Sequence, residues 1–240
     1  MEEYTTRLKS REEIAERTIA FHLEKPPGFD FRPGQFVDLT LLDPPETDSQ
    51  GTVRTFTLAS APYENELVVA TRIRQSAFKR VLATLPPGTP LRLEGPMGSF
   101  LVHKNPARAA VFLAGGIGIT PFRSILRHAV REGFPHPVYL FYSNRHPEDA
   151  AFLKEMDDLA ASHSQFLFIP TMTEMERSQL SWNGERRFID RDLLAQHFCD
   201  LKGPIFYAAG PPAMVAAMRD LLIRNDVSEG DIHTEEFGGY

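Results

Sequence analysis

The segment Val111–Phe122 constrains the fold of this chain more than any other stretch. An apolar run ends in glycines and an apolar-periodic segment follows, which predicts a buried strand, a tight turn and a helix. Gly116 and Gly118 let the backbone turn sharply and approach a ligand closely, because glycine has no Cβ. Thr120 is expected as the N-cap and Pro121 as the first helical residue. The spacing G-x-G-x-x-P is a variant of the dinucleotide-binding fingerprint, although an ordinary strand–helix turn has the same pattern.

Composition excludes several classes of function. The chain has 240 residues and a formal net charge of -6, which argues against nucleic acid as a partner. A single cysteine, Cys199, excludes a disulfide framework and an all-cysteine metal site. The histidines form no H-x-x-H or HExxH pattern, so we expect no metal site. No run reaches transmembrane length and Met1–Tyr4 is not a leader, so we expect a cytoplasmic monomer without membrane contact.

The first part of the chain, residues 4–100, is rich in short strand patterns separated by Pro, Gly and Asp. Such a series predicts an antiparallel sandwich or small barrel. The polar stretch Asp43–Gly51 has no strand pattern and suits either a loop beside a site or disorder. A helix is expected at Ser76–Leu82. The expected strands are Tyr4–Lys9, Ile14–Leu23, Gln35–Leu42, Val53–Ser60, Glu66–Arg74 and Pro90–Leu93.

From Ala109 onward strand and helix patterns alternate, which predicts a parallel sheet with helices on both faces. The expected strands are Ala110–Leu113, Val138–Tyr142, Phe166–Pro170, Ile205–Ala208 and Ile232–Glu235. The expected helices are Pro121–Arg131, Pro147–Ala160, Asp190–His197 and Pro211–Ile223. We therefore predict an antiparallel β-barrel domain over residues 1–102, followed by an α/β parallel-sheet nucleotide-binding domain over residues 103–240.

Two segments of the β-rich part have side chains suited to an anionic, planar ligand. Arg54 and Phe56 lie on one face of a predicted strand and Thr57 on the other. Arginine pairs with phosphate and an aromatic ring stacks on a planar group. Farther on, Gly98 and Ser99 offer backbone N–H groups and a hydroxyl to a phosphate. Each segment alone also fits an ordinary strand or an ordinary turn.

Taken together and in this order, the motifs resemble the ferredoxin–NADP reductase family. The resemblance extends from about Tyr4 to Tyr240 and depends on six motifs. Two positions depart from it, since Phe56 replaces the family's tyrosine and Ala209 its cysteine. The six motifs are Pro33-Gly34-Gln35-Phe36; Arg54, Phe56 and Thr57; Gly95, Pro96, Gly98 and Phe100; Gly115, Gly116, Gly118, Thr120 and Pro121; Ala209, Gly210, Pro211 and Met214; and Glu235 with Phe237.

The resemblance implies a flavoenzyme that passes hydride between NAD(P)H and FAD. Phe56 would stack on the flavin, Thr57 would lie near flavin N5, and Arg54 would bind the diphosphate. The implied catalytic residues are Thr57, Glu235 and Tyr240, the last as a cover over the flavin or as a frayed terminus. The implied cofactor-binding residues are Arg54, Phe56, Thr57, Arg72, Ser76, Gly98, Ser99, Gly115, Gly116, Gly118, Thr120, Pro121, Ser143, Arg145, Gly210, Pro211 and Met214.

The nicotinamide type and the electron acceptor are less constrained by the sequence. Ser143 and Arg145 follow the second strand of the α/β part, where an NAD site has an acidic residue, so NADP is favoured and NAD stays open. Arg145 as a merely solvated residue is the alternative. Single electrons would go to a ferredoxin, a flavodoxin or an oxygenase component, docked on Arg74, Lys79 and Arg80. The alternatives are an NAD(P)H:flavin reductase that uses flavin as substrate and a non-catalytic redox subunit of a larger complex.

Overall fold

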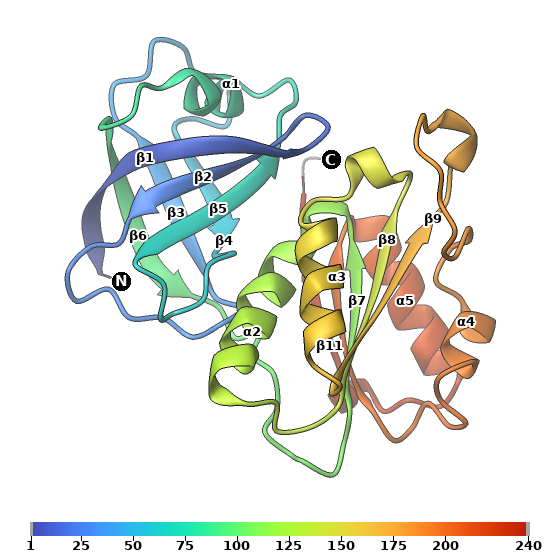
Figure 1. Ribbon diagram of the computed structural model, residues 1–240. Coiled ribbons are helices and arrows are strands. Elements are labelled where there is room, and N and C mark those ends of the chain that lie inside the picture. The colour runs from blue at the N-terminus through green and yellow to red at the C-terminus, as the bar shows by residue number, and fades with distance from the viewer. Residues whose placement is uncertain (1, 239–240) are drawn as a thin grey trace. The chain divides into compact units, whose positions relative to one another are not determined.

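A computed structural model describes residues 2–238, which divide into two compact units (Figure 1). The first unit ends at Leu101 but also takes in Thr120–His128, and the remaining residues from Val102 onward form the second. The predicted boundary between residues 102 and 103 stays a prediction, because helix α2 (Ile119–Glu132) contributes residues to both units. Among the described residues, no helix combines the length and the apolar character needed to cross a bilayer.

The first unit contains an antiparallel sheet of six strands in the order β4-β3-β6-β1-β2-β5. The order ends at β4 and β5, so the predicted barrel is confirmed as a barrel-like sheet that does not close through its described strands. In β3 buried and half-buried positions alternate, as expected for a strand with one face on the core. The elements are β1 (Glu3–Ala15), β2 (Thr18–Glu24), β3 (Phe36–Leu41), β4 (Val53–Thr57), β5 (Glu66–Arg72), α1 (Ala77–Thr84) and β6 (Pro90–Met97).

The expected strands Tyr4–Lys9 and Pro90–Leu93 extend farther in the structure, to Ala15 and Met97, and two other expected strands include residues outside any strand. The expected strand Ile14–Leu23 is interrupted, because the chain reverses between β1 and β2 at Arg17, whose φ is +55°. The expected strand Val53–Ser60 ends at Thr57. Ser60 instead accepts a hydrogen bond on its hydroxyl from the Val68 N–H, at 3.0 Å, and so supports the backbone.

The first half of α2 packs against the antiparallel sheet, which explains why it groups with the first unit. The Arg123 guanidinium donates to the Ala59 carbonyl at 2.7 Å, and the Ser124 hydroxyl donates to the Ser60 carbonyl at 2.6 Å. The Phe122 ring lies 5.7 Å from that of Phe100. These contacts join the helix to the segment that follows β4.

The second unit is built on a parallel sheet of five strands in the order β11-β10-β7-β8-β9, with α3 on one face and α5 on the other (Figure 1). All six residues of β7 are buried, as in a parallel strand covered on both faces. The predicted α/β fold is confirmed. The strands are β7 (Ala110–Gly115), β8 (Val138–Asn144), β9 (Phe166–Met172), β10 (Ile205–Gly210) and β11 (Ile232–Glu236). The helices are α3 (Leu153–Ser162), α4 (Arg191–Ala195) and α5 (Pro212–Arg224), with short 3-10 turns η3 (Met175–Arg177) and η4 (Glu229–Asp231).

The expected helix Pro147–Ala160 is split in the structure. A 3-10 turn η2 (Pro147–Asp149) is followed by Phe152 with φ +58°, and α3 begins only after it. A left-handed residue interrupts the helical hydrogen bonds, and the apolar spacing alone does not reveal it. The expected helix Asp190–His197 is the shorter α4, with Asp190 as its N-cap, because the Asp190 carboxylate accepts from the Leu193 N–H at 2.8 Å.

The glycine turn after β7 differs from the prediction in one detail. A 3-10 turn η1 (Gly116–Gly118) leads directly into α2, so Gly118 is the N-cap and Thr120 is the second helical residue. The prediction of Thr120 as N-cap is therefore wrong. Pro121, the third helical residue, still costs no hydrogen bond, because first-turn N–H groups have no intrahelical partner.

Candidate functional site

In the first unit, the arginine predicted to bind a diphosphate and the start of α1 both contact a carboxylate of the chain itself. The Asp48 carboxylate accepts from Arg54 Nη2 at 2.9 Å and from the N–H of Ala77, the first residue of α1, also at 2.9 Å. Arg54 Nη1 donates to the carbonyls of Gln50, Gly51 and Val53. The guanidinium and the start of α1 thus form an anion site that Asp48 occupies.

Hydrogen bonds hold Asp48 in its ionised form. Desolvation by burial acts to raise the pKa of this carboxyl. The N–H groups of Gln50 and Ala77, together with the charge and hydrogen bond of Arg54, outweigh that effect and lower the pKa below its ordinary value. At neutral pH the anion site therefore contains a full negative charge.

Further positive charge lies around this anion site. Burial lowers the pKa of the half-buried Lys79, and the charges of Arg74 and Arg54 lower it further, which shows that three cations lie near one another. The Ser76 hydroxyl oxygen is buried directly before α1, with no hydrogen-bond partner among the described residues. One carboxylate does not neutralise three cations, so the cluster retains net positive charge suited to a diphosphate.

The residues predicted to contact the flavin ring are mostly buried in the core of the first unit. The Phe56 ring is 6% exposed, belongs to the hydrophobic core and packs 5.9 Å from the ring of Phe78. Thr57 is buried beside it at the end of β4, while Arg72 is half-buried at the end of β5. Contact of Phe56 and Thr57 with a flavin stays a prediction.

The predicted turn after β6 is exposed and strictly needs glycine. Gly98 has φ +97°, and a Cβ there would lie 2.8 Å from the Phe36 ring. Its carbonyl accepts from the Gln35 side chain at 3.3 Å. Ser99 is exposed on the same turn. Gln35 and Phe36 belong to the predicted P-G-Q-F motif, so the structure brings these two motifs together.

In the second unit, the turn after β7 and the turn after β10 meet. A Cβ on Gly118 would lie 2.2 Å from the Ala209 carbonyl oxygen, and a Cβ on Gly115 would lie 2.2 Å from the Met214 sulfur. Gly210, with φ +153°, approaches the Gly115 backbone, and Pro211 also borders Gly115. Two motifs separated by about ninety residues thus form one glycine-lined edge of the sheet, at the carboxyl ends of the strands where nucleotides bind.

Space for a ligand remains at this edge. A Cβ on Gly116, whose φ is +52°, would meet no atom of the described chain within 4 Å. The Gly116 carbonyl accepts from the buried Tyr142 hydroxyl at 3.1 Å, which fixes the turn. Glu235 lies beside Ala209 in the β10–β11 register. Tyr240 lies outside the described residues.

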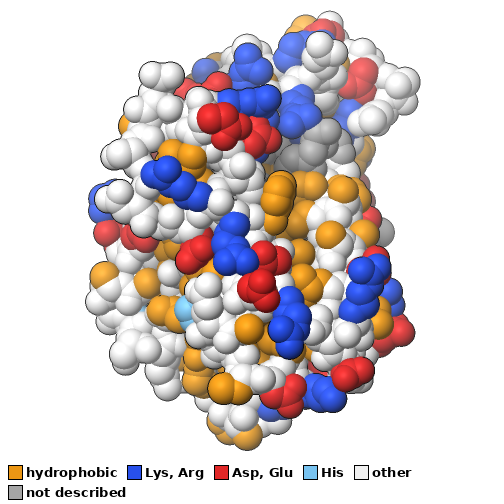
Figure 2. Space-filling view, turned by 90° about the vertical axis from the view of Figure 1, so that its right-hand side faces the viewer, with side chains coloured by type: hydrophobic (Ala, Val, Ile, Leu, Met, Phe, Trp, Pro, Cys, Tyr) orange, Lys and Arg blue, Asp and Glu red, His pale blue; other side chains and the backbone are white. Residues whose placement is uncertain are grey.

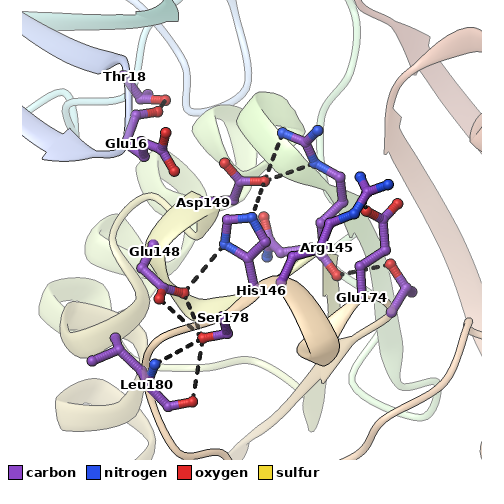
Figure 3. Close-up of polar contacts among 12 residues, drawn as sticks. Glu16, Thr18, Arg145, His146, Glu148, Asp149, Glu174, Ser178 and Leu180 are labelled. Carbon is purple, nitrogen blue, oxygen red and sulfur yellow. Dashed lines mark hydrogen bonds and ion pairs between the residues drawn. The ribbon is translucent and has the colours of Figure 1, made fainter.

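The end of β8 carries a dense cluster of charged side chains (Figure 3). Arg145 Nε and Nη2 both lie 2.7 Å from the same oxygen of Asp149. The His146 ring stands between two carboxylates, 3.2 Å from that of Glu148 and 3.6 Å from that of Asp149. Ser143 is half-buried on the strand. Arg145, predicted to bind a 2′-phosphate, is thus engaged by a carboxylate of its own chain.

Glu148 fastens the loop after β9 to this cluster. Its carboxylate accepts from the Ser178 hydroxyl at 2.8 Å and from the Gln179 N–H at 2.9 Å. Desolvation acts to raise the pKa of Glu148. Hydrogen bonds from its own N–H, Ser178 and Gln179, with the charge of His146, more than offset this and lower the pKa to about 2. Glu148 is therefore ionised throughout the physiological range.

A cavity of about 550 Å³ opens beside this loop. One acidic and one basic side chain, Glu176 and Arg186, border it. The cavity was not predicted from the sequence, because its walls come from the last residue of β9 and the loop that follows it. The lining residues are Met172, Thr173, Met175, Glu176, Leu180, Ser181, Trp182 and Arg186.

The residues predicted to dock a redox partner differ in their environment. Arg80 forms a two-point ion pair with Glu46, at 3.0 and 2.9 Å, Lys79 is half-buried, and Arg74 is exposed. On the face drawn in Figure 2, basic and acidic side chains are interspersed around apolar ones. A docking role for Arg74, Lys79 and Arg80 stays a prediction.

Sequence reasoning missed Asp48 and Asp149, the two carboxylates that hold the predicted phosphate-binding arginines. Arg145 and Asp149 lie four residues apart, and this nearness of opposite charges in the sequence was a usable signal. Asp48 gave a weaker signal, because it lies six residues before Arg54 in a polar loop, and its other partner Ala77 lies 29 residues farther along the chain.

Comparison with known proteins now bears on this geometry. Residues 112–220 match the family described as Oxidoreductase NAD-binding domain. The match covers most of the parallel-sheet unit, from β7 into α5. The reductase component of propane 2-monooxygenase from Rhodococcus jostii is 26% identical over 99% of this chain and 64% of its own length. The reductase component of the naphthalene 1,2-dioxygenase system of Pseudomonas putida is 27% identical over 92% of this chain and 64% of its own.

Solved structures of reductases share the fold of this chain. A ferredoxin NADP+ reductase from Neisseria gonorrhoeae, with bound FAD and NADP, matches with a TM-score of 0.81 at 21% identity, over 98% of each chain. The Amycolatopsis cytochrome P450 reductase GcoB matches with a TM-score of 0.82 at 23% identity, over 98% of this chain and 70% of its own. The chain spans about three fifths of the length of the curated relatives it matches.

Proposed function

We propose that the chain is an FAD-dependent oxidoreductase that takes hydride from a nicotinamide dinucleotide and delivers single electrons to a separate acceptor. The observation that carries the proposal is the meeting of the Gly115–Gly118 turn with Ala209 and Gly210 at the edge of the parallel sheet. The same edge is where dinucleotides bind in sheets of this kind. The similarity to oxygenase reductase components over 92–99% of the chain supports it.

The residues of the first unit fit an FAD diphosphate. Arg54, Lys79 and the first N–H of α1 would hold its two negative charges, and the Ser76 hydroxyl lacks, among the described residues, the partner that a phosphate oxygen would supply. Thr57 and the turn at Gly98 and Ser99 would border the same cofactor. When bound, FAD accepts the two electrons of a hydride and returns them one at a time.

The residues of the second unit would bind and orient the nicotinamide dinucleotide. The open space at Gly116 would admit the diphosphate. Gly118 and Gly210 allow the two turns to pack closely, so that both would contact it. Met214 and Pro211 would border the nicotinamide end, and Glu235 would place a polar group near it. Positioning by the chain supplies the rate enhancement in this proposal, with no acid–base side chain required.

The acceptor in this proposal is a ferredoxin, a flavodoxin or an oxygenase component. The two relatives are reductase components of a monooxygenase and a dioxygenase system, which favours an oxygenase-linked acceptor. We further propose that the chain acts in the cytoplasm as a monomer.

One observation favours a second function, NAD(P)H:flavin reductase. Asp48 already occupies donors that a flavin diphosphate needs, so flavin would bind weakly and leave readily. In such an enzyme the flavin is a substrate that departs after reduction, rather than a held cofactor.

Gel filtration followed by turnover separates these functions. Purified chain is saturated with FAD, passed through the column and mixed anaerobically with each nicotinamide dinucleotide and a one-electron dye. Retained FAD with turnover supports the proposal, and turnover that requires added flavin supports the flavin reductase. Failure to bind FAD and to oxidise either dinucleotide contradicts both.

A further inference from the structure

The residue that follows β8 determines which dinucleotide the second unit prefers. In a parallel sheet of this kind, an acidic residue near this strand end binds the ribose diol of NAD, and a free arginine accommodates the 2′-phosphate of NADP. The chain has Arg145 at this position. Its availability for phosphate depends on what the guanidinium already binds.

The Arg145 side chain is 46% exposed, but a carboxylate of the chain already balances its charge. Its Nε and Nη2 share one oxygen of Asp149 at 2.7 Å, and the Asp149 side chain is only 6% exposed. Removing Arg145 from this pair would leave a buried carboxylate without its main counter-charge, which is strongly destabilising. The pair therefore persists when a nucleotide binds, and its net charge is zero.

The surroundings of the pair add negative charge. Glu148 is ionised at neutral pH and lies 3.2 Å from His146, which stands against Asp149. Glu174 donates its N–H to the Arg145 carbonyl at 2.7 Å, so its side chain belongs to the same strand end. A 2′-phosphate placed here would bring about two further negative charges toward carboxylates.

The Glu174 carboxylate in turn pairs with Arg177, at 2.7 Å. Counting Arg145 and Arg177 against Glu148, Asp149 and Glu174 leaves an excess of one negative charge among these five side chains. An excess of negative charge disfavours a phosphate and leaves a neutral diol unaffected.

The neighbouring residue Asn144 is suited to a neutral partner. It is 6% exposed, and neither the oxygen nor the nitrogen of its amide has a hydrogen-bond partner among the described residues. An amide offers both a donor and an acceptor, as a ribose hydroxyl does. A buried amide without such partners at the carboxyl end of β8 marks a place where an uncharged polar ligand group would be stabilised.

We propose that the chain prefers NADH to NADPH, and that Asp149 is the specificity-determining positioning residue because it holds Arg145 and keeps this strand end from being positive. This inference rests on the proposed function. It reverses the expectation from sequence, which favoured NADP because the Ser143 hydroxyl and Arg145 at this strand end suit a 2′-phosphate.

Calorimetric titration of the full chain with the oxidised dinucleotides tests the preference without any reaction. NAD+ should bind at least about tenfold more tightly than NADP+, as expected from about 1.4 kcal/mol of charge repulsion. In Asp149→Asn the Kd for NADP+ should fall about tenfold while that for NAD+ stays nearly constant. The matched control is Asp158→Asn, which breaks an exposed ion pair of the same four-residue spacing with Lys154 and should leave both constants unchanged.

Glu174→Gln provides a second variant. It removes a partly exposed carboxylate and leaves the buried Asp149 unchanged, so it does not disturb the packing there. It should lower the Kd for NADP+ about threefold. Failure of both dinucleotides to bind the parent chain contradicts the proposed function. Tighter NADP+ than NAD+ binding by the parent chain overturns only this inference. If the ratio of the Kd values for NADP+ and NAD+ changes in neither variant, Asp149 does not determine the specificity.

Discussion

The two arginines predicted to bind phosphate form the same kind of ion pair, but the two aspartates differ in how deeply they are buried. Arg54 in the first unit and Arg145 in the second each pair with an aspartate of their own chain. In the first pair the aspartate is 31% exposed, and in the second it is 6% exposed. An exposed carboxylate can return to water when a ligand replaces it, whereas a buried one loses its counter-charge.

The charges around the two pairs also differ. Arg74 and Lys79 add positive charge near Arg54, while Glu148 and Glu174 add negative charge near Arg145. An arginine near a strand end therefore does not by itself identify a phosphate site. The sign of the surrounding charge and the burial of its partner decide whether an anion can bind.

The largest effect is expected from a substitution in the glycine turn of the second unit, which should weaken dinucleotide binding alone. In Gly118→Ala the new Cβ would lie 2.2 Å from the Ala209 carbonyl, so the two turns must separate. Overpacking of this kind costs about 3 kcal/mol, equivalent to about a hundredfold weaker binding of the dinucleotide. Calorimetry with NAD+ measures the effect, with FAD binding expected to persist.

Gly203→Ala is the matched control, because a Cβ at Gly203 meets no atom of the described residues within 4 Å. It should bind both ligands as the parent chain does. Unchanged NAD+ affinity in Gly118→Ala would mean that the dinucleotide does not pass this turn.

Asp48→Asn tests whether the carboxylate in the anion site of the first unit competes with FAD. It removes the charge that competes with a flavin diphosphate and keeps an amide oxygen able to accept from the Ala77 N–H. FAD should therefore bind about tenfold more tightly, in line with one charge-assisted contact. Quenching of flavin fluorescence gives the Kd.

Asp43→Asn lies on the same loop and is exposed, so it serves as the control for charge alone. Weaker FAD binding in Asp48→Asn than in this control would show that Asp48 supports the flavin site rather than competing for it.

Lys79→Met has a smaller effect in the same cluster. The methionine retains the apolar stem but not the charge, so FAD should bind about threefold more weakly, and the difference should shrink at high salt. Arg80→Gln on the same helix is the control, because Arg80 already pairs with Glu46. Equal loss of affinity in both variants would mean that general surface charge, rather than the anion site, attracts FAD.

The smallest effect concerns the acid stability of the second unit. Burial, followed by the charge of the stacked His136, lowers the pKa of His103 from 6.5 to about 4. Between these values the unfolded chain binds a proton that the folded chain does not, so stability falls as pH falls from about 6.5 to about 4. Thermal unfolding across this range should show a shallower decline in His103→Asn. Identical slopes would mean that His103 does not contribute.

Much of the fold was predictable because it follows from local patterns. The continuous apolar run of β7 and the glycines after it predicted the strand and the turn, and the alternation after Ala109 predicted the parallel sheet. The misplaced N-cap at Thr120 and the split at Phe152 arise from single backbone conformations. A 3-10 turn and a left-handed residue leave the hydrophobic spacing almost unchanged.

The electrostatics of the candidate site were less predictable than its location. The residue types at Arg54 and Arg145 indicated phosphate, but their partners decide what they can bind. Asp48 reaches the start of α1 across 29 residues, and the acidic surroundings of Arg145 come partly from Glu174 on another strand end. Such long-range partners become visible only when the chain is folded.

The most direct test of the difference between the two units is anaerobic reduction of the FAD-loaded chain. The loss of flavin absorbance measures the rate of reduction. We predict that NADH bleaches the flavin, and that NADPH at the same concentration does so at least about tenfold more slowly. Faster bleaching by NADPH, or a flavin that neither dinucleotide reduces, would contradict this view of the two anion sites.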